Sequence, residues 1–256
     1  MKSRLSRLGF LQSAGMCGAC LPWLGHVVHA AEPAGPKTKA RVLLVTGVDY
    51  PGHVWRETAP VLAQLLRQDA RLTVAVIEDP HLLDSAALRS YDAAVLHFMN
   101  WEVPAPGEAA RQNLRSFVEG GGGLLLVHFA CGAWQDWPEF KNLAGRAYDP
   151  KLPPHDPRGP FAVRIGDHDH PVTRGLADFQ ADDELYTCLG GDRPIRVLAT
   201  AKSKVDGRDY PMAFVFAYGK GRVFHSPLGH DGKAFQMTGV AEILRRGCVW
   251  TAGLSP

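Results

Sequence analysis

Cysteine is scarce in this 256-residue sequence, and its spacing excludes a disulfide-rich fold. Two of the five cysteines, Cys17 and Cys20, lie in an N-terminal segment that we expect to be removed. The remaining Cys131, Cys188 and Cys248 are odd in number and far apart, unlike the pattern of a small domain held by several bridges. Hydrophobic residues make up 46% of the chain, which is enough to form a core without such bridges.

Concentrated positive charge and nucleotide-binding motifs are also absent. The formal charge of +2 includes three bases among residues 1–30 and becomes −1 without them, and no run rich in Lys or Arg follows. The sequence has no phosphate-binding Gly-x4-Gly-Lys-Ser/Thr motif, and the four glycines at 120–123 precede an apolar run instead of following one. We interpret these glycines as a helix stop and a tight turn. Neither a nucleic-acid partner nor a nucleotide cofactor is therefore expected.

Long hydrophobic runs are confined to the N-terminus, where residues 1–30 have the pattern of an export signal. Three bases precede a mostly apolar stretch, and residues 28–30 fit a small-residue cleavage site. The start is similar to a twin-arginine signal, but Leu8 stands where the second arginine belongs, so general secretion is an equal alternative. An uncleaved amphiphilic anchor is a further alternative. We expect a periplasmic protein without a membrane span in the mature chain, with a flexible leader at 31–39 and a single domain at 40–254.

The sequence predicts an α/β fold built around a short apolar strand at residues 124–127. This run is bounded by glycine and does not alternate with polar residues, which is typical of a strand buried on both faces. Three further strands are expected near the N-terminus of the domain, and helical patterns separate them. The expected strands are 40–46, 72–77 and 91–97, and the expected helices are 55–68 and 106–119. This alternation favours a three-layer α/β/α sandwich with a mostly parallel central sheet.

The regular alternation ends after about residue 146. Residues 147–160 contain five prolines and are expected to form a long loop. Short strands are predicted at 161–166, 184–189 and 195–201, and the segments 212–216 and 221–225 are predicted to form a hairpin. An amphipathic helix at 237–250 is expected to close the chain.

Several polar and aromatic residues follow the predicted strands, and in a parallel sheet they would meet at one edge. His53, Asn100, His128 and His230 each come after a different strand, and Glu184 lies in the irregular segment. Imidazoles and a carboxylate in one place can bind a divalent metal or act as general acid and base. A core or loop role is the alternative for each histidine, and core packing is the alternative for each tryptophan. The predicted roles are catalysis by His128, Glu184 and His230, substrate binding by His53, Asn100, Trp101, Trp134, Tyr186 and Asp231, and ligation of a divalent metal such as Zn²⁺ by His53, His128 and His230.

Cys131 is a candidate nucleophile of a different kind. A thiol at a strand-to-helix turn can be activated by the helix N-terminus, and a partner such as His230 would complete an acyl-transfer enzyme. The predicted strand ends at Val127, however, so His128 occupies the sharp turn and Cys131 falls later. We therefore favour a buried, inert thiol at this position.

Several segments in order together resemble the ThuA-like (trehalose utilisation) family over residues 40–253. They are Val45-Thr46-Gly47, His53-Val54-Trp55-Arg56, residues 124–132, His170-Pro171-Val172-Thr173-Arg174-Gly175-Leu176, Asp183-Glu184-Leu185-Tyr186, and residues 218–231 with their Gly229-His230-Asp231 end.

The resemblance implies a flavodoxin-like fold of the class I glutamine amidotransferase-like superfamily. Amidotransferases of this fold place a cysteine at the turn after the central strand, where this chain has His128. They also carry a His-Pro-Glu near the end, where this chain has His230-Asp231. Both departures argue against glutamine hydrolysis.

The resemblance further implies a role in bacterial carbohydrate use, including the processing of 3-keto-glycosides made by partner oxidoreductases. The first hypothesis is a periplasmic enzyme that cleaves or otherwise processes a sugar or 3-keto-glycoside. A 3-keto group acidifies the neighbouring C–H, so a positioned base could start elimination or hydrolysis. The alternatives are a non-catalytic sugar-binding protein on the same fold and a Cys131-dependent hydrolase.

Overall fold

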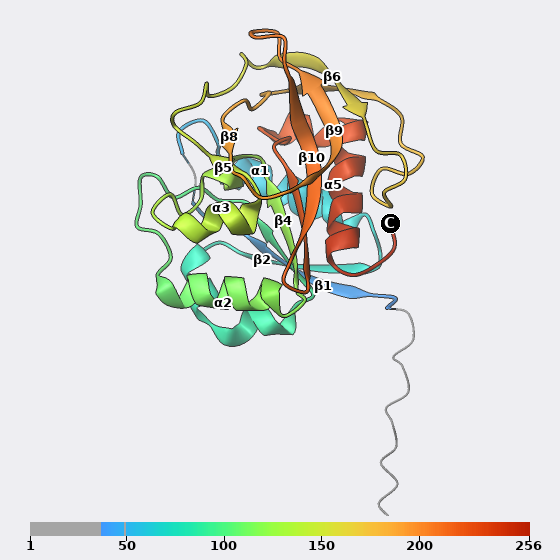
Figure 1. Ribbon diagram of the computed structural model, residues 1–256. Coiled ribbons are helices and arrows are strands. Elements are labelled where there is room, and N and C mark those ends of the chain that lie inside the picture. The colour runs from blue at the N-terminus through green and yellow to red at the C-terminus, as the bar shows by residue number, and fades with distance from the viewer. Residues whose placement is uncertain (1–36, 49) are drawn as a thin grey trace, which may run out of the picture. The chain divides into compact units, whose positions relative to one another are not determined.

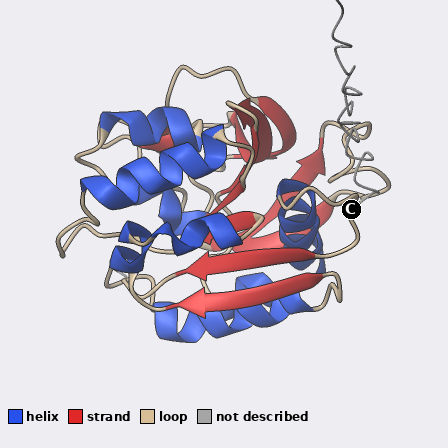
Figure 2. Ribbon diagram, turned by 90° about the horizontal axis from the view of Figure 1, so that it is seen from below, coloured by secondary structure: helices blue, strands red, loops and turns tan. Residues whose placement is uncertain are grey.

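The computed structural model describes residues 37–48 and 50–256, and these form a nine-stranded sheet with helices on both faces (Figures 1 and 2). The predicted export signal, the alternative anchor and most of the leader lie outside the described residues. In sheet order the strands are β2 (Leu72–Ile77), β1 (Ala40–Val45), β3 (Ala93–Leu96), β4 (Gly123–Val127), β11 (Gly221–Ser226), β10 (Asp209–Tyr218), β9 (Arg196–Lys202), β6 (Gly159–Ile165) and β7 (Phe179–Asp183). A second, two-stranded sheet pairs β5 (Ala147–Tyr148) with β8 (Leu189–Gly190).

The described residues contain eight helical segments. The α-helices are α1 (Trp55–Arg67), α2 (Glu108–Glu119), α3 (Pro138–Ala144), α4 (Gly232–Gln236) and α5 (Thr238–Thr251), and the 3-10 helices are η1 (Pro80–Asp84), η2 (Ala86–Ser90) and η3 (His128–Gly132). None of the helices in the described part of the chain is long and apolar enough to cross a membrane.

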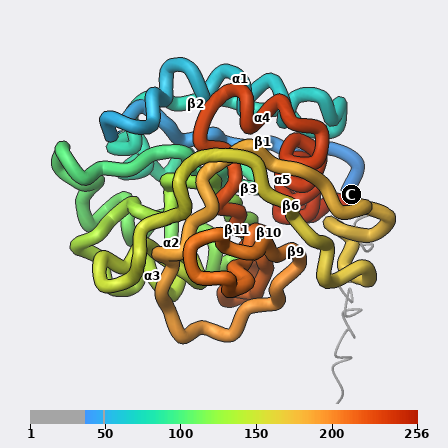
Figure 3. The backbone as a smooth tube through the Cα atoms, turned by 90° about the horizontal axis from the view of Figure 1, so that it is seen from above, coloured from blue at the N-terminus to red at the C-terminus, as the bar shows by residue number. Residues whose placement is uncertain are grey.

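The central strand β4 is buried on both faces, and its sequence is therefore a continuous apolar run without alternating polar residues. Its side chains point to both faces in turn: Leu125 and Val127 pack with α1 and α5, whereas Leu124 and Leu126 pack with α2 and α3. Viewed along the layers, α1 and α4 lie on one side of the strands and α2 and α3 on the other (Figure 3). The predicted three-layer α/β sandwich is therefore confirmed.

The direction of each strand decides which residues meet at the site. The five strands from β2 to β11 run parallel, so their carboxyl ends share one edge. The remaining pairings are antiparallel, and by alternation β7 again points toward that edge. The antiparallel half also turns back over the parallel half, because β7 contacts α4 and α5. The residues that follow β7 therefore reach the same edge as those that follow β4 and β11.

One predicted strand, at 184–189, is wrong. Strand β7 ends at Asp183, and the next strand, β8, begins only at Leu189. Residues 185–188 are all buried, and the segment crosses the edge of the sheet instead of joining it. The backbone N–H of Asp156 donates to the Leu185 carbonyl, and Tyr186 forms an isolated bridge with His155. This crossing segment carries two of the predicted site residues over the carboxyl ends of the strands.

Candidate functional site

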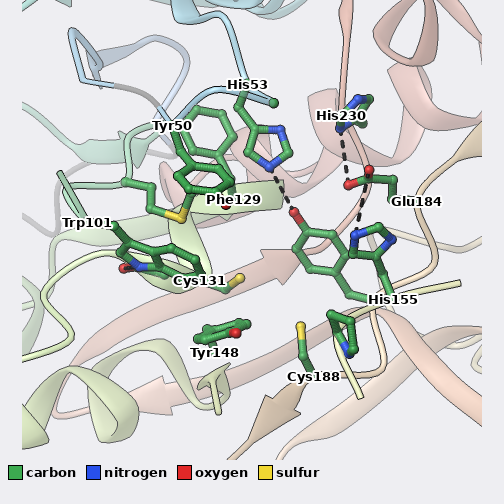
Figure 4. A pocket seen from close by; sticks show the side chains of 15 residues that line it. Tyr50, His53, Trp101, Phe129, Cys131, Tyr148, His155, Glu184, Cys188 and His230 are labelled. Carbon is green, nitrogen blue, oxygen red and sulfur yellow. Dashed lines mark hydrogen bonds and ion pairs between the residues drawn. The ribbon is translucent and has the colours of Figure 1, made fainter. Parts of the chain in front are cut away.

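Four residues that are far apart in the sequence converge at the carboxyl edge of the sheet. Three of them, His53, Glu184 and His230, are labelled in Figure 4. His53 lies in the loop after β1, His128 follows β4, Glu184 follows β7 and His230 follows β11. Each offers one ligand atom, and these atoms all lie within 4.8 Å of one another. The sequence predicts this meeting from strand ends for the three histidines and from the irregular segment for Glu184, and the structure brings the four side chains together.

His128 is held in one orientation and one tautomer by its surroundings. It is fully buried, and its φ of 48° is uncommon for a residue with a side chain. Its Nδ1 lies 2.6 Å from the Pro227 carbonyl oxygen, which can only accept, so Nδ1 carries the proton. The lone pair on Nε2 therefore faces the cluster, where the Tyr186 hydroxyl lies 2.9 Å away. A strained backbone with a fixed tautomer is typical of a residue whose ring nitrogen has a function.

Glu184 and His230 form an ion pair at the centre of the cluster. His230 Nδ1 lies 3.2 Å from Glu184 Oε2, although the pair is not aligned as a directional hydrogen bond. This carboxylate raises the pKa of His230 above its ordinary value, against the effect of burial. Burial alone would raise the pKa of Glu184, but His128 and His230 outweigh it and lower this pKa below its usual range. Glu184 is therefore ionised at neutral pH.

His53 is neutral and has an unused ring nitrogen. Burial, followed by the charges of His128 and His230, lowers the pKa of His53 to about 2. Its ring stacks on Phe129 at 4.9 Å, and its Nε2 lies 3.4 Å from the Tyr186 hydroxyl. Its Nδ1 is buried and has no hydrogen-bond partner in the described structure. A buried, neutral imidazole with a free nitrogen is suited to binding a metal.

The cluster satisfies the chemical requirements of a divalent metal site. It offers nitrogen and oxygen ligands, with ring nitrogens at His53, His128 and His230, of which His53 is neutral, and an ionised carboxylate at Glu184. Two atoms bound to one Zn²⁺ at about 2.1 Å each lie no more than about 4.2 Å apart. The present spread of up to 4.8 Å would therefore close with small side-chain rotations. These four residues could hold a metal.

Asp183 holds the backbone of two cluster residues in place by accepting hydrogen bonds. The sequence analysis did not select this residue. It is fully buried, and its carboxylate accepts hydrogen bonds from the backbone N–H groups of Glu184, Gly229 and His230 at 2.7 to 3.1 Å. Burial raises the pKa of Asp183, while the charge of His128 and these N–H groups act against the rise. The signal was available, because alternation along β7 buries both Ala181 and Asp183.

Other predicted residues lie in the cavity itself. Tyr186 contacts His53 and His128, and Trp101 lines the opposite wall, where its Nε1 donates to the Gly132 carbonyl at 2.8 Å. The cavity of about 320 Å³ is within the range of small-molecule sites. Its lining also includes residues that the sequence analysis did not select, namely Tyr50, Met99, Phe129, Tyr148, Pro154, His155 and Cys188.

Three residues predicted to bind substrate direct their side chains to partners within the protein. The Asn100 side chain accepts from the Trp134 backbone N–H at 2.9 Å. Trp134 itself is buried in an aromatic cluster with Phe98, and its indole N–H donates to Pro106. Asp231 caps α4 by accepting from Ala234 N–H, and it pairs with Arg158. Each follows a strand or its turn as predicted, but position after a strand does not say which way a side chain points.

Cys131 lines the cavity but lacks the features of a nucleophile. It is buried within η3, one short helical turn after His128. Burial raises the pKa of this thiol well above its usual value, and the neighbouring Cys188 adds to the rise. The thiol is therefore protonated at neutral pH, which supports the expectation of an inert cysteine.

Comparison with known proteins agrees with this fold. A family model described as ThuA, trehalose utilisation, matches residues 41–251. A crystal structure from Parabacteroides merdae ATCC 43184, described as ThuA-like, is 27% identical with a TM-score of 0.76 and covers 85% of this chain and 91% of its own. One from Bacteroides uniformis ATCC 8492, also described as ThuA-like, is 21% identical with a TM-score of 0.67 over 87% and 94%, which shows the fold alone.

A GMP synthase protein from Thermoplasma acidophilum shares the fold at 12% identity, with a TM-score of 0.53 over 84% of this chain and 94% of that one. The architecture is thus the flavodoxin-like fold of the class I glutamine amidotransferase superfamily. A comparison with curated proteins gave no match. Because the family match spans most of the sequence, this protein belongs to the ThuA (trehalose utilisation) family.

Proposed function

We propose that this protein is an exported, metal-dependent enzyme of carbohydrate utilisation that hydrolyses the glycosidic bond of a 3-keto-glycoside. The observation that carries the proposal is the convergence of three imidazoles and one carboxylate at one end of a cavity of small-molecule size. The keto-sugar would come from a sugar oxidoreductase, because a ketone at C3 requires a prior two-electron oxidation. The periplasm is the proposed location, on the pattern of residues 1–30.

In this proposal His53, His128 and His230 hold a divalent metal, and Glu184 is the acid and base. A bound divalent ion would polarise the ketone oxygen and stabilise the negative charge that develops on it. Nε2 of His128, whose Nδ1 lies against the Pro227 carbonyl, and the unpartnered Nδ1 of the neutral His53 would supply two nitrogen ligands for such an ion. Occupation of His128 Nε2 would also release the Tyr186 hydroxyl, which then donates a hydrogen bond to the sugar.

Glu184 moves the proton in both halves of the reaction. Its carboxylate removes the proton from C2, and the electrons of the C2–H bond pass toward the C3 oxygen. Their return forms the C1–C2 double bond and breaks the bond from C1 to the glycosidic oxygen, which takes the proton from Glu184. Water then adds at C1. Glu184 takes one proton from this water and transfers it to C2, so the net reaction is hydrolysis. Glu184 is suited to this because it is half-buried and ionised, and bordered by His155 at 3.9 Å.

The test combines metal analysis with turnover. The purified protein is analysed for bound metals, treated with chelator and reloaded with Zn²⁺, Mn²⁺ or Co²⁺, and then incubated with 3-keto-trehalose and with trehalose. We expect about one metal per chain, and cleavage of the keto-sugar alone that is lost with the metal. His128→Ala and His230→Ala should lose both metal and activity, whereas the exposed His81→Ala should keep both. Sugar binding without turnover under every metal condition would instead identify a non-catalytic sugar-binding protein.

A further inference from the structure

We propose that the end of the cavity farthest from Glu184 and His230 binds an aromatic leaving group, so that aryl glycosides are the preferred substrate class over disaccharides. The inference deepens the proposed function, and it rests on that function in treating the bound glycoside as a substrate. The binding preference itself depends only on the cavity wall and can be tested without catalysis.

The cavity has two chemically distinct ends (Figure 4). One end gathers the groups that can ionise or exchange protons, namely His53, His155, Glu184, Tyr186 and His230. The other is lined by aromatic rings and sulfur atoms, from Tyr50, Met99, Trp101, Cys131, Tyr148 and Cys188. A glycoside whose bond is cleaved at the first end must place its leaving group toward the second.

Trp101 is fixed as an aromatic wall of the second end. Its Nε1 donates to the Gly132 carbonyl at 2.8 Å, so the indole has no polar group left for a ligand. Tyr50 meets the indole edge-on at 5.2 Å, and Tyr148 lies 4.6 Å from it on the other side. The side chain is nevertheless 38% exposed. An aromatic ring fixed in a cavity wall favours stacking of another flat ring.

Gly132 is what allows this wall to form. A Cβ atom at this position would lie 2.7 Å from Met99 Sδ and 3.1 Å from Trp101 Nε1, so the Met99 side chain would have to move and the indole would have to shift slightly. The absence of a side chain at residue 132 therefore lets Met99 and Trp101 lie where they do in the cavity wall. The aromatic wall is thus a feature of the local sequence and not a gap left by loose packing.

The sulfur atoms make this end a poor host for sugar hydroxyls. Burial raises the pKa of Cys188 to about 12 and raises that of Cys131 as well, so both thiols stay neutral. Thiols and thioethers are weak hydrogen-bond partners. A second pyranose could stack one face on Trp101. The hydroxyls at its edges would, however, exchange hydrogen bonds with water for weak contacts with these sulfur atoms. The hydroxyls of Tyr50 and Tyr148 are the stronger partners among this group, and they suit a phenolic substituent better than a ring of hydroxyls.

The experiment measures binding of unreactive probes to the metal-loaded protein. Isothermal titration compares phenyl β-D-glucoside, methyl β-D-glucoside and trehalose, none of which carries the keto group. We expect the phenyl glucoside to bind about tenfold more tightly than the methyl glucoside, in line with one aromatic contact and its buried area. In Trp101→Ala the two should agree within about twofold, whereas Trp101→Phe keeps most of the difference. The exposed neighbour Val103 provides the control, and Val103→Ala should leave the ratio unchanged.

Two results would overturn the inference. One is equal affinity for the phenyl and methyl glucosides, including the absence of measurable binding by either at millimolar concentration. The other is tightest binding of trehalose together with its loss in Trp101→Ala, which would assign the same wall to a second sugar. Because no bond is cleaved in this assay, a preference for phenyl glucoside would stand even if 3-keto-glycosides were not hydrolysed.

Discussion

The substitution Asp183→Asn tests whether the cluster depends on the buried carboxylate that positions two of its members. Asp183 Oδ1 accepts from the N–H groups of Glu184 and His230 at 2.8 and 3.1 Å, and Oδ2 accepts from Gly229 N–H at 2.7 Å. An asparagine keeps one acceptor oxygen but places an NH₂ group where the other oxygen was. A donor would then face a buried backbone donor at hydrogen-bond distance.

The expected cost follows from the bonds that are lost. A buried donor left without a partner costs about 1–3 kcal/mol, and hydrogen bonds to a charged group are worth about 1.5–3 kcal/mol. We therefore expect the free energy of unfolding to fall by about 2–3 kcal/mol. Displacement of the loop that carries His230 should also lower metal affinity by about 10- to 100-fold, as is usual when a residue that orients a ligand is removed.

The assay pairs urea unfolding of the metal-free protein with a metal-binding titration. The neighbouring Asp182→Asn is the matched control, because that carboxylate is about half exposed and its ion pair with Arg158 spans 3.7 Å. Its stability should change by no more than about 0.5 kcal/mol. If Asp183→Asn binds metal as tightly as the wild type, then Asp183 does not organise the cluster and the reasoning is refuted.

Three further predictions concern the metal, the thiol and the buried histidines. Adding Zn²⁺ at about 100 times its dissociation constant should stabilise the wild type by about 2.7 kcal/mol, seen as a higher melting temperature, and should have little effect on His128→Ala. Cys131→Ser should keep activity on a 3-keto-glycoside within about threefold, and a loss of a hundredfold would restore the thiol as a nucleophile. Burial lowers the pKa of His97 to about 3 and of His225 to about 4, so the unfolded state binds protons first as the pH falls below about 6.5. The free energy of unfolding should therefore fall toward pH 4 by about 1.4 kcal/mol per pH unit for each of these histidines, and urea unfolding of His225→Asn should show one proton less in that slope.

The sequence was most informative about the parallel half of the fold. The strand expected at 72–77 has the observed bounds, and the one expected at 124–127 differs by a single residue. Strand β4 is buried on both faces, so its apolar run is continuous and begins sharply at glycine, and the edge strand β2 is mostly apolar with only Thr73 exposed. The segment 184–189 gave a similar local pattern, yet it is not a strand. Its path is set by contacts with residues 155 and 156 that no local pattern encodes.

The site could be predicted only as far as strand ends define it. His53, His128 and His230 follow parallel strands, so topology alone brings their backbones together. Asn100 and Asp231 satisfy the same rule, but their side chains turn away to bond with the backbone of Trp134 and Ala234. The rule predicts at which edge of the sheet each residue lies. It does not predict the direction of the side chain, which depends on the conformation of one or two residues in the turn.

Residue 128 shows how a single position changes the chemistry that this fold can perform. The turn after the central strand is where the resemblance to amidotransferases leads one to expect a thiol, and here the residue has a φ of 48° and an imidazole side chain. A thiol at this point would present one reactive atom, but an imidazole has two nitrogens, and the Pro227 carbonyl occupies one of them. The other is thereby left as a lone pair aimed at His53, Glu184 and His230. Four separate strand ends then contribute to one site whose residues could hold a cation and, in the proposed reaction, move a proton without a covalent intermediate on the protein.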